Sequence, residues 1–323
     1  MINKSQLKQA VAQGIINQQQ MDALITLTQQ SSQHHSGEEH LRFVRGFGDV
    51  FITLGILLVA ISFNFTGLSG YYYGVPIGIF ILAAEWLVRV RKLSLPGMAI
   101  LICIIYFVNA LFTELGQEKS FYNLGLITAT SLAFYLRYKM PFSLLPTAGS
   151  IIVMLIYTIG IDIIQQPYLL SLMGLMVFSM AMWFDARDTQ RQNYLSDSAF
   201  WLHLLAAPLI AHGVMIVLVM AEPGSLLAVN RNLFIISFFV LFFLIALFID
   251  RRALLISSTV YAIYAITQLA SGQFADVQSL IAFVFMAFGI FVVLFGTYWY
   301  KVRNLLFGWC RKTAIAQYIP NFR

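Results

Sequence analysis

Ten windows of mostly apolar residues follow one another between residues 47 and 298, and each is about as long as a membrane-crossing helix. A helix rises 1.5 Å per residue, so ~30 Å of hydrocarbon takes about 20 residues. The predicted spans are residues 47–65, 71–88, 97–113, 121–138, 142–160, 168–184, 198–221, 232–249, 253–270 and 278–298. The sequence therefore predicts an all-α fold, a polytopic transmembrane helical bundle of about ten spans.

Composition excludes a soluble protein. Hydrophobic residues make up 59% of the chain and charged residues 11%, and the mean hydropathy is +0.79. So few charged residues cannot cover the surface of even one soluble domain. The net charge of +6 comes from basic residues spread between apolar segments, not gathered into one patch, so we predict no nucleic-acid partner. The predicted partner is the lipid bilayer.

The placement of Lys and Arg predicts the topology, because cytoplasmic loops collect these residues. With the N-terminus in the cytoplasm, only Lys119 and Arg231 fall outside, which leaves 18 of the 20 basic residues on one side. Dropping or adding one span would move every later loop, with its basic residues, to the other side of the membrane. We therefore expect a multi-pass protein of a bacterial inner membrane with both termini in the cytoplasm.

The chain divides into three parts: residues 1–40, 41–300 and 301–323. The first is polar and rich in Gln and Ser, with Gly14 and Asn17 predicted to separate two short helices ahead of a flexible linker at 29–40. This soluble hairpin is too small to stand alone, so we expect it to dock on the membrane domain, on a protein partner or on a second copy. The third part alternates basic and apolar residues, a pattern typical of an amphipathic helix on anionic lipid.

Ten spans with both ends on one side can be divided as five plus five, with the second half running opposite to the first, as in many secondary transporters. The fourth and ninth spans would then correspond, and both have a polar face. These faces contain Thr128, Ser131, Tyr135 and Tyr138 in the fourth span, and Ser257, Tyr261, Tyr264 and Gln268 in the ninth. Gly70, Gly74 and Gly78 are spaced four apart and predict a close approach by a neighbouring helix.

Ser257, Tyr261, Tyr264 and Gln268 are the best candidates for lining a cavity, because polar groups in lipid need partners, water or a ligand. The alternative, which is the commoner case, is hydrogen bonding that holds packed helices together.

His203 and His212 lie in the seventh predicted span, where a histidine can relay protons, bind a metal or form a hydrogen bond. Nine residues turn a helix by about 900°, so the two rings are predicted to face opposite sides. We find no metal-binding motif and no convergent acid and base, so we predict no metal, no cofactor, no catalytic residue and no enzymatic activity. Histidines that pack and form a hydrogen bond are the default interpretation; a proton or substrate role is the alternative.

Residues 185–197 form the most charge-dense loop, with charges of both signs. They could organise a salt-bridged gate, but a solvated loop is the favoured interpretation. Asp197 is expected to cap the seventh span. Glu85 is expected to reach the lipid headgroups or to pair with Arg89 one turn further on.

Two stretches, Met182–Asp188 and Ser196–His212, carry a resemblance, together with Tyr298–Leu306 and Ile319-Pro320 near the end. The chain resembles a family of uncharacterised multispanning proteins of proteobacterial inner membranes, chiefly at Asp185-Ala-Arg-Asp188 and at Asp197 to His212. Its opening is similar to that of a broader family of predicted bacterial membrane proteins of unknown function. The resemblance implies a location and a fold, and it assigns no activity to any residue.

Two functions fit these observations. The first is a small-molecule carrier, because ten spans with short loops are similar in architecture to the drug and metabolite transporter superfamily. The second is a membrane scaffold or sensor that recruits a partner through residues 1–40. An intramembrane enzyme ranks last, because His203, His212 and an acidic residue are not placed on one helix face.

Overall fold

The computed structural model describes residues 4–25, 44, 46–114, 120–191, 193–270 and 276–320. Within these ranges the chain is almost entirely helical and has no strand, which confirms the predicted all-α class. Eight of the described helices are long and apolar enough to cross a membrane. Apolar side chains also cover the outside: only 11% of the α3 window is buried, so most of this helix is left to contact lipid. The protein is a helical membrane protein.

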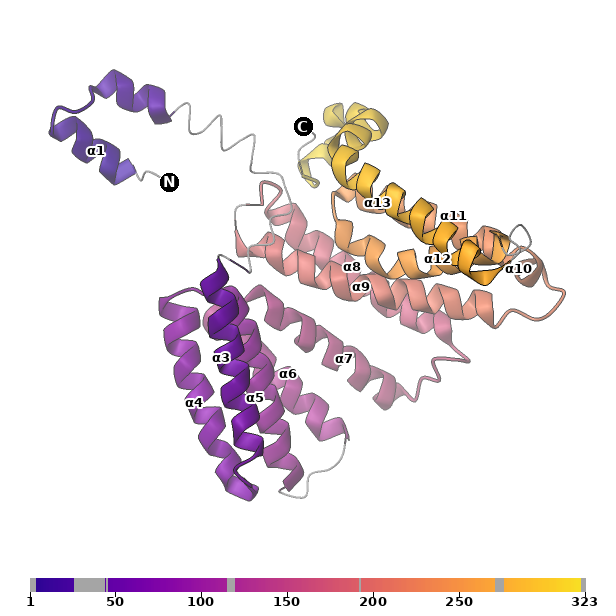
Figure 1. The fold of residues 1–323 in the computed structure, drawn as a ribbon, viewed down its shortest axis with the longest axis horizontal. Helices are drawn as coiled ribbons and strands as arrows, with labels where there is room; N and C mark the ends of the chain where they lie inside the picture. Colours follow the sequence, from indigo (N-terminus) through magenta and orange to yellow (C-terminus); the bar gives the residue numbers. More distant parts are fainter. Residues whose placement is uncertain are drawn as a thin grey trace.

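The first half of the membrane domain is a bundle of four helical segments, seen at the lower left of Figure 1. These are α3 (Phe47–Asn64), the segment Gly70–Val90 with α4 (Gly74–Ala84) at its centre, α5 (Ser94–Glu114) and α6 (Ser120–Tyr138). Their core centres on Phe107, which stacks on Phe80 and meets Phe63 edge-on. α5 contributes the largest share of the buried apolar residues and lies between its neighbours.

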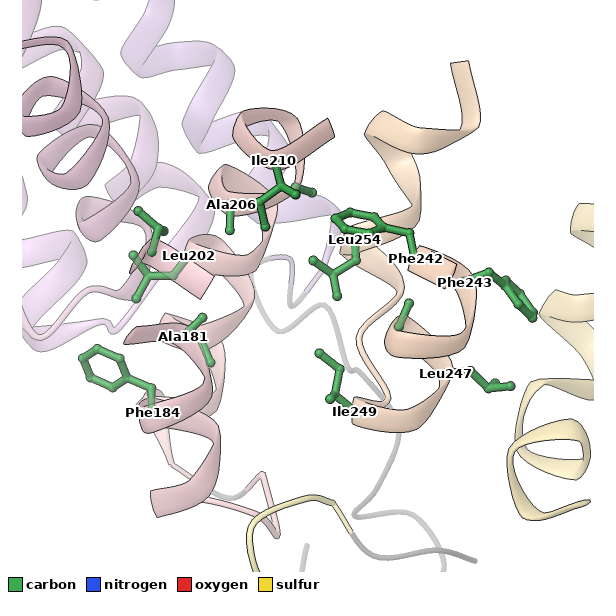
Figure 2. Packing of buried hydrophobic residues seen from close by; sticks show 14 of the residues in the cluster. Ala181, Phe184, Leu202, Ala206, Ile210, Phe242, Phe243, Leu247, Ile249 and Leu254 are labelled. Carbon is green, nitrogen blue, oxygen red and sulfur yellow. The ribbon is translucent and has the colours of Figure 1, made fainter. Parts of the chain in front are cut away.

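The helices of the second half pack around the hairpin of α8 and α9. The elements are α7 (Leu144–Ile159), α8 (Pro167–Arg187), α9 (Tyr194–Val219), the short α10 (Leu226–Val229), α11 (Arg231–Ile249), α12 (Leu255–Ala270) and α13 (Val277–Phe307). Figure 2 shows how Leu202 and Ala206 of α9 pack beside Ala181 of α8, with Phe242 and Leu247 of α11 across the core. In Figure 1, α7 lies between the two halves.

Each of the ten predicted spans overlaps a helix, and the two outside the group of eight are the predicted fourth and ninth. α12 has 16 residues and is therefore only ~24 Å long. α6 has 19 residues, but Asn, Thr, Ser, Tyr and Arg interrupt its apolar face. Polar residues therefore separate α6 from the other eight helices, and its length of 16 residues separates α12.

Close helix approach occurs in a different place from the one predicted. A Cβ built at Gly70, Gly74 or Gly78 would meet nothing within 4 Å, so the prediction for these glycines is wrong. At Gly213 of α9 the same Cβ would lie 2.7 Å from the Pro167 carbonyl oxygen of α8. Spacing alone does not decide the contact, because the glycines must also face another backbone.

The N-terminal hairpin consists of α1 (Lys4–Ala12) and a second helix over residues 18–25. Gly14 takes a left-handed φ of +69° between them. Asn17 and Gln20 cap the second helix reciprocally, each side chain accepting the other's backbone N–H at 2.9 and 2.7 Å. In Figure 1 this hairpin stands apart from the membrane helices. The predicted linker at 29–40 lies outside the described residues.

The C-terminal part is not one amphipathic helix. α13 continues through the predicted boundary at residue 300 to Phe307, and short 3₁₀ turns follow at Gly308–Lys312 and Ala314–Gln317. Cys310 and Ile319 of this tail are buried, whereas Leu305 and Trp309 are exposed. The tail therefore folds partly against the protein, because its apolar residues do not fall on one continuous helical face.

Candidate functional sites

Seven charged or ionisable side chains are buried together where α8 ends and α9 begins, and we call this group the buried ion cluster. Its members are Asp185, Asp188, Arg191, His203, Asp250, Arg251 and Arg303. Each is 5% exposed or less. The elements that bring them together are the α8–α9 connection, the end of α11 and the second half of α13.

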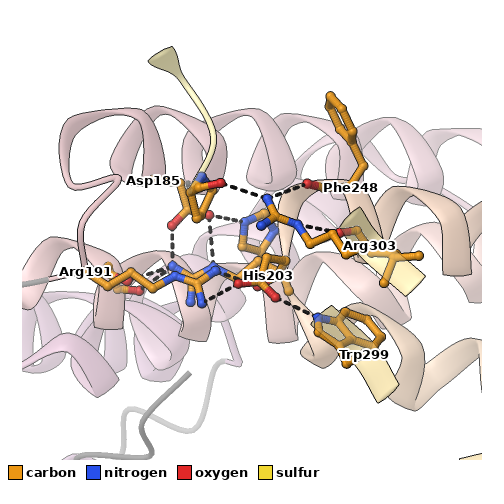
Figure 3. A network of polar contacts seen from close by, with 11 residues as sticks. Asp185, Arg191, His203, Phe248, Trp299 and Arg303 are labelled. Atoms are coloured by element: carbon orange, nitrogen blue, oxygen red, sulfur yellow. Dashed lines mark hydrogen bonds and ion pairs between the residues drawn. The ribbon is translucent and has the colours of Figure 1, made fainter. Parts of the chain in front are cut away.

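Asp185 is the centre of the cluster. Its Oδ2 lies 2.9 Å from His203 Nε2, and Arg251 Nε donates to the same oxygen at 3.1 Å. Arg251 Nη2 donates to the other carboxylate oxygen and, at 3.0 and 2.8 Å, to the carbonyl and hydroxyl oxygens of Ser196. Arg251 therefore joins the turn after α11 to both α8 and α9. Figure 3 shows Asp185, Arg191 and His203 within this polar network.

Asp250 forms the second centre. It ends α11 in a left-handed conformation with φ +57°, which Asp tolerates better than most residues. Arg191 pairs with its carboxylate at 3.0 Å and donates to its backbone carbonyl at 2.5 Å, and Trp299 Nε1 donates to Oδ1 at 2.7 Å. The α8–α9 loop and α13 are thereby attached to the same end of α11.

Arg303 of α13 binds backbone oxygens instead of a carboxylate. It donates to the carbonyls of Leu247 and Phe248 at 3.0 and 3.1 Å, which are among the last carbonyls of α11. The Leu247 carbonyl also accepts from the backbone N–H of Asp250 at 3.4 Å. Its Nη2 also donates to the Pro320 carbonyl at 2.8 Å, which ties the C-terminal tail to the cluster.

These contacts correct two sequence predictions. The segment 185–197 is only partly solvated, because Asp185, Asp188 and Arg191 are buried and bonded, whereas Arg187 and Asn193 are exposed. Asp197 is not the cap of α9 either: the helix begins at Tyr194 after Asn193, so Asp197 lies in its first turn. The presence of charges of both signs in this segment indicated the ion pairs better than its overall charge density indicated a solvated loop.

Sequence reasoning missed Asp250, Arg251 and Arg303, because it used the two arginines only as markers of topology and gave Asp250 no role. The signal that could have found them is an acid–base doublet directly at the end of an apolar span, as in Asp250-Arg251. Next to lipid, adjacent charges of opposite sign gain from partners in the protein.

The structure brings together two of the six candidate site residues. His212 Nδ1 of α9 lies 2.5 Å from the Tyr261 hydroxyl of α12, with the two rings edge-on. His203, nine residues earlier, faces α8 instead. On α12, Ser257 is half-buried, whereas Tyr264 and Gln268 are exposed.

The polar face of α6 bonds to α7. Thr128 and Ser150 hydroxyls are 2.8 Å apart, and Thr147 donates to the Ser131 hydroxyl at 2.9 Å. These four residues hold two helices together, so this face matches the alternative of ordinary interhelical hydrogen bonding.

A cleft of about 450 Å³ lies between α5 and α6 and is lined by Phe112, Phe121, Tyr122, Gly125 and Leu126. Its lining includes none of the polar residues of α12.

Comparisons of the chain with protein-family models, with curated proteins and with solved structures find no match. The class of helical membrane protein therefore comes from the fold alone.

Proposed function

We propose that this protein is a small-molecule carrier with its substrate site between α9 and α12. The observation that carries the proposal is the His212–Tyr261 pair, in which an imidazole of α9 meets a phenol hydroxyl of α12 beside a small apolar cluster. Tyr261 is half-buried and His212 is exposed, so a polar solute that reaches this contact can bind both side chains.

The position of α12 supports the same function. In transporters built from repeats, unusually short or interrupted segments at corresponding positions of the two halves point to the binding site. α6 and α12 match the two predicted spans that are not among the eight long apolar helices, and these are the fourth and ninth predicted spans. We propose that both cross the membrane, giving ten spans in a five-plus-five arrangement.

The remaining features of the proposal come from the charge pattern and the resemblance. We propose that both termini lie in the cytoplasm and that the membrane is a bacterial inner membrane, as in the uncharacterised proteobacterial family that the chain resembles. The buried ion cluster would then lie at the cytoplasmic ends of α8, α9, α11 and α13.

An uptake comparison tests the carrier. Inverted membrane vesicles with and without the protein are incubated with a cell extract, and the solutes retained are compared by untargeted mass spectrometry. We expect at least one solute whose accumulation needs the protein and falls in Tyr261→Phe and His212→Gln. The matched control is Tyr157→Phe on α7, which removes an exposed hydroxyl. If no solute depends on the protein while all variants fold, the carrier is rejected.

That rejection would favour a scaffold or sensor, which one observation supports independently. The N-terminal hairpin stands apart from the membrane helices and exposes Ile15 and Leu24 (Figure 1). The scaffold predicts that Ile15→Asp, in full-length protein, abolishes crosslinking to one partner or to a second copy without changing any solute. If Ile15→Asp leaves every crosslink unchanged, the scaffold is rejected as well.

A further inference from the structure

One imidazole and one guanidinium share a single carboxylate in the buried ion cluster. Asp185 Oδ2 accepts from Arg251 Nε at 3.1 Å and lies 2.9 Å from His203 Nε2 (Figure 3). An Arg side chain is charged at every physiological pH, whereas a histidine changes its charge between roughly pH 5 and 8. His203 therefore determines whether one or two cations compete for Asp185.

The charges around His203 balance when its ring is neutral. Tyr135 on α6 packs against the neighbouring apolar core. Arg252 lies with its guanidinium carbon 5.1 Å from the Trp299 ring centroid, but it is exposed and solvent screens its charge. The buried ionisable groups at this end are Asp185 and Asp188 at the end of α8, Arg191 in the loop, Asp250 and Arg251 after α11, and Arg303 on α13. Three carboxylates thus face three guanidiniums. A proton on His203 would leave one positive charge in excess, and a buried charge without a full counter-charge is unfavourable.

We propose that His203 is a proton-binding site that controls the hold of Arg251 on Asp185. His203 already donates to Oδ2 through Nε2, and a second proton on its Nδ1 adds a positive charge that opposes Arg251 at the same carboxylate. Release of Arg251 admits water that solvates the excess charge. Proton binding and separation of Arg251 then favour each other, because the coupling between two such steps is reciprocal. The proposal rests on the carrier function in one respect: there, the proton is the coupling ion.

The geometry connects this event to the proposed substrate site. Arg251 stands between α11 and α12 and is bonded to α8 through Asp185 and to α9 through Ser196. Its release therefore removes the polar bonds that tie the start of α12 to both helices and leaves the apolar packing through Leu254. The same α12 places Tyr261 against His212 further along α9. Proton binding at one end of the α9–α12 contact can thus change the contact at the polar pair.

A distance measurement in lipid nanodiscs tests the proton site without any solute. Spin labels are placed at Met180→Cys on α8 and Val260→Cys on α12, both exposed, with Cys103 and Cys310 changed to Ala. Between pH 8.5 and 5 we expect a second, longer distance to gain population. Its ratio to the first should rise by up to about tenfold per pH unit, the limit for one proton.

Three variants make the measurement specific. His203→Gln keeps a hydrogen-bonding group without a charge, so it should hold the shorter distance at every pH. Arg251→Gln should give the longer distance at every pH, and Arg251→Lys serves if the Gln variant does not fold. Tyr157→Phe, at an exposed position on α7, should keep the wild-type response. An unchanged distance in the wild type, or a pH response that survives in His203→Gln, would overturn the proposal.

The wild-type protein provides a second readout that needs no variant of His203. Nitrogen NMR of histidine-labelled protein should show one buried ring, beside an Asp, that gains a proton over the same pH range as the distance change. A ring that keeps one charge state throughout that range would overturn the proposal.

The carrier function and the proton site can be rejected independently of each other. A pH-dependent distance that needs His203, in a protein that moves no solute, keeps the proton site and rejects the carrier. Solute movement in a protein whose distance ignores pH rejects only the proton site.

Discussion

Two carboxylates occupy similar places in the two halves of this protein, near the basic ends of their helices, and their surroundings differ sharply. Glu85 binds Arg89, Arg137 and Tyr138 at 2.9 to 3.1 Å, but its side chain is 33% exposed. Asp185 binds Arg251 and His203 with 2% of its side chain exposed. Both have two basic partners, so burial and not the number of contacts distinguishes them.

The difference lies in what each interaction contributes. Water and headgroups can replace the partners of Glu85, so its ion pairs contribute little to stability. No solvent reaches Asp185, so its partners cannot be replaced without moving a helix. The ion pairs of Glu85 in the first half therefore do little to hold its helices in place. In the second half, the buried contact of Asp185 with Arg251 can control the arrangement of α8, α9 and α12.

Breaking the Asp185–Arg251 ion pair is expected to have the largest effect. Asp185→Asn leaves Arg251 buried without its counter-charge, and we expect a loss of about 3–5 kcal/mol in the free energy of unfolding. The measurement is an equilibrium unfolding titration in mixed micelles. Glu85→Gln is the matched control and should unfold within error of the wild type. Equal losses in the two variants would mean that burial does not separate the two carboxylates.

A second comparison concerns helix contact in the two halves. Gly213→Ala puts a methyl group 2.7 Å from the Pro167 carbonyl oxygen, so α8 and α9 must separate, and we expect a loss of about 1–3 kcal/mol. Gly78→Ala on α4 meets nothing within 4 Å and should leave stability unchanged. The same unfolding titration measures both. A Gly78→Ala variant as unstable as Gly213→Ala would indicate a contact surface on α4 with another chain.

These cases also show how far the sequence predicts the molecule. Segment length and apolar content are local properties, so every predicted span finds a helix, and Gly14 and Asn17 predict the break in the N-terminal hairpin. Glu85 and Arg89 are one helical turn apart, so their pairing can also be predicted from the sequence. Arg251 with Asp185 is separated by 66 residues, and only the packing of α11 against α8 and α9 creates that contact. The contact of His212 with Tyr261 likewise depends on packing between distant segments. The sequence predicted each of them as a site residue but did not predict that they pair.

A third test examines the C-terminal tail over the buried ion cluster. Arg303→Met removes the donor to Pro320 and to two carbonyls of α11, and a charged hydrogen bond contributes about 1.5–3 kcal/mol. Since 1.4 kcal/mol corresponds to tenfold in an equilibrium, maleimide labelling of buried Cys310 should speed up by about tenfold or more. Cys103, buried in the first half, is the internal control and should label as slowly as before. A parallel rise at Cys103 would indicate general loosening instead of tail release.

The smallest effect is expected at a third carboxylate, Asp276, whose hydrogen bonds to described residues all lie within its own helix. It caps α13 by accepting the backbone N–H and the hydroxyl of Ser279 at 2.7 and 2.8 Å. These hydrogen bonds lower the pKa of the Asp276 carboxyl below its usual value, since they favour the charged form. A group with a lowered folded-state pKa stabilises the protein above its unfolded-state pKa, and this contribution disappears as the pH falls through the folded-state pKa. The stability difference between wild type and Asp276→Ala should therefore be constant above roughly pH 5 and shrink below about pH 4. Unfolding titrations of both proteins across this range measure it. A difference that grows on acidification would mean that the carboxyl donates as a neutral acid, and Asp276 would then resemble neither Glu85 nor Asp185.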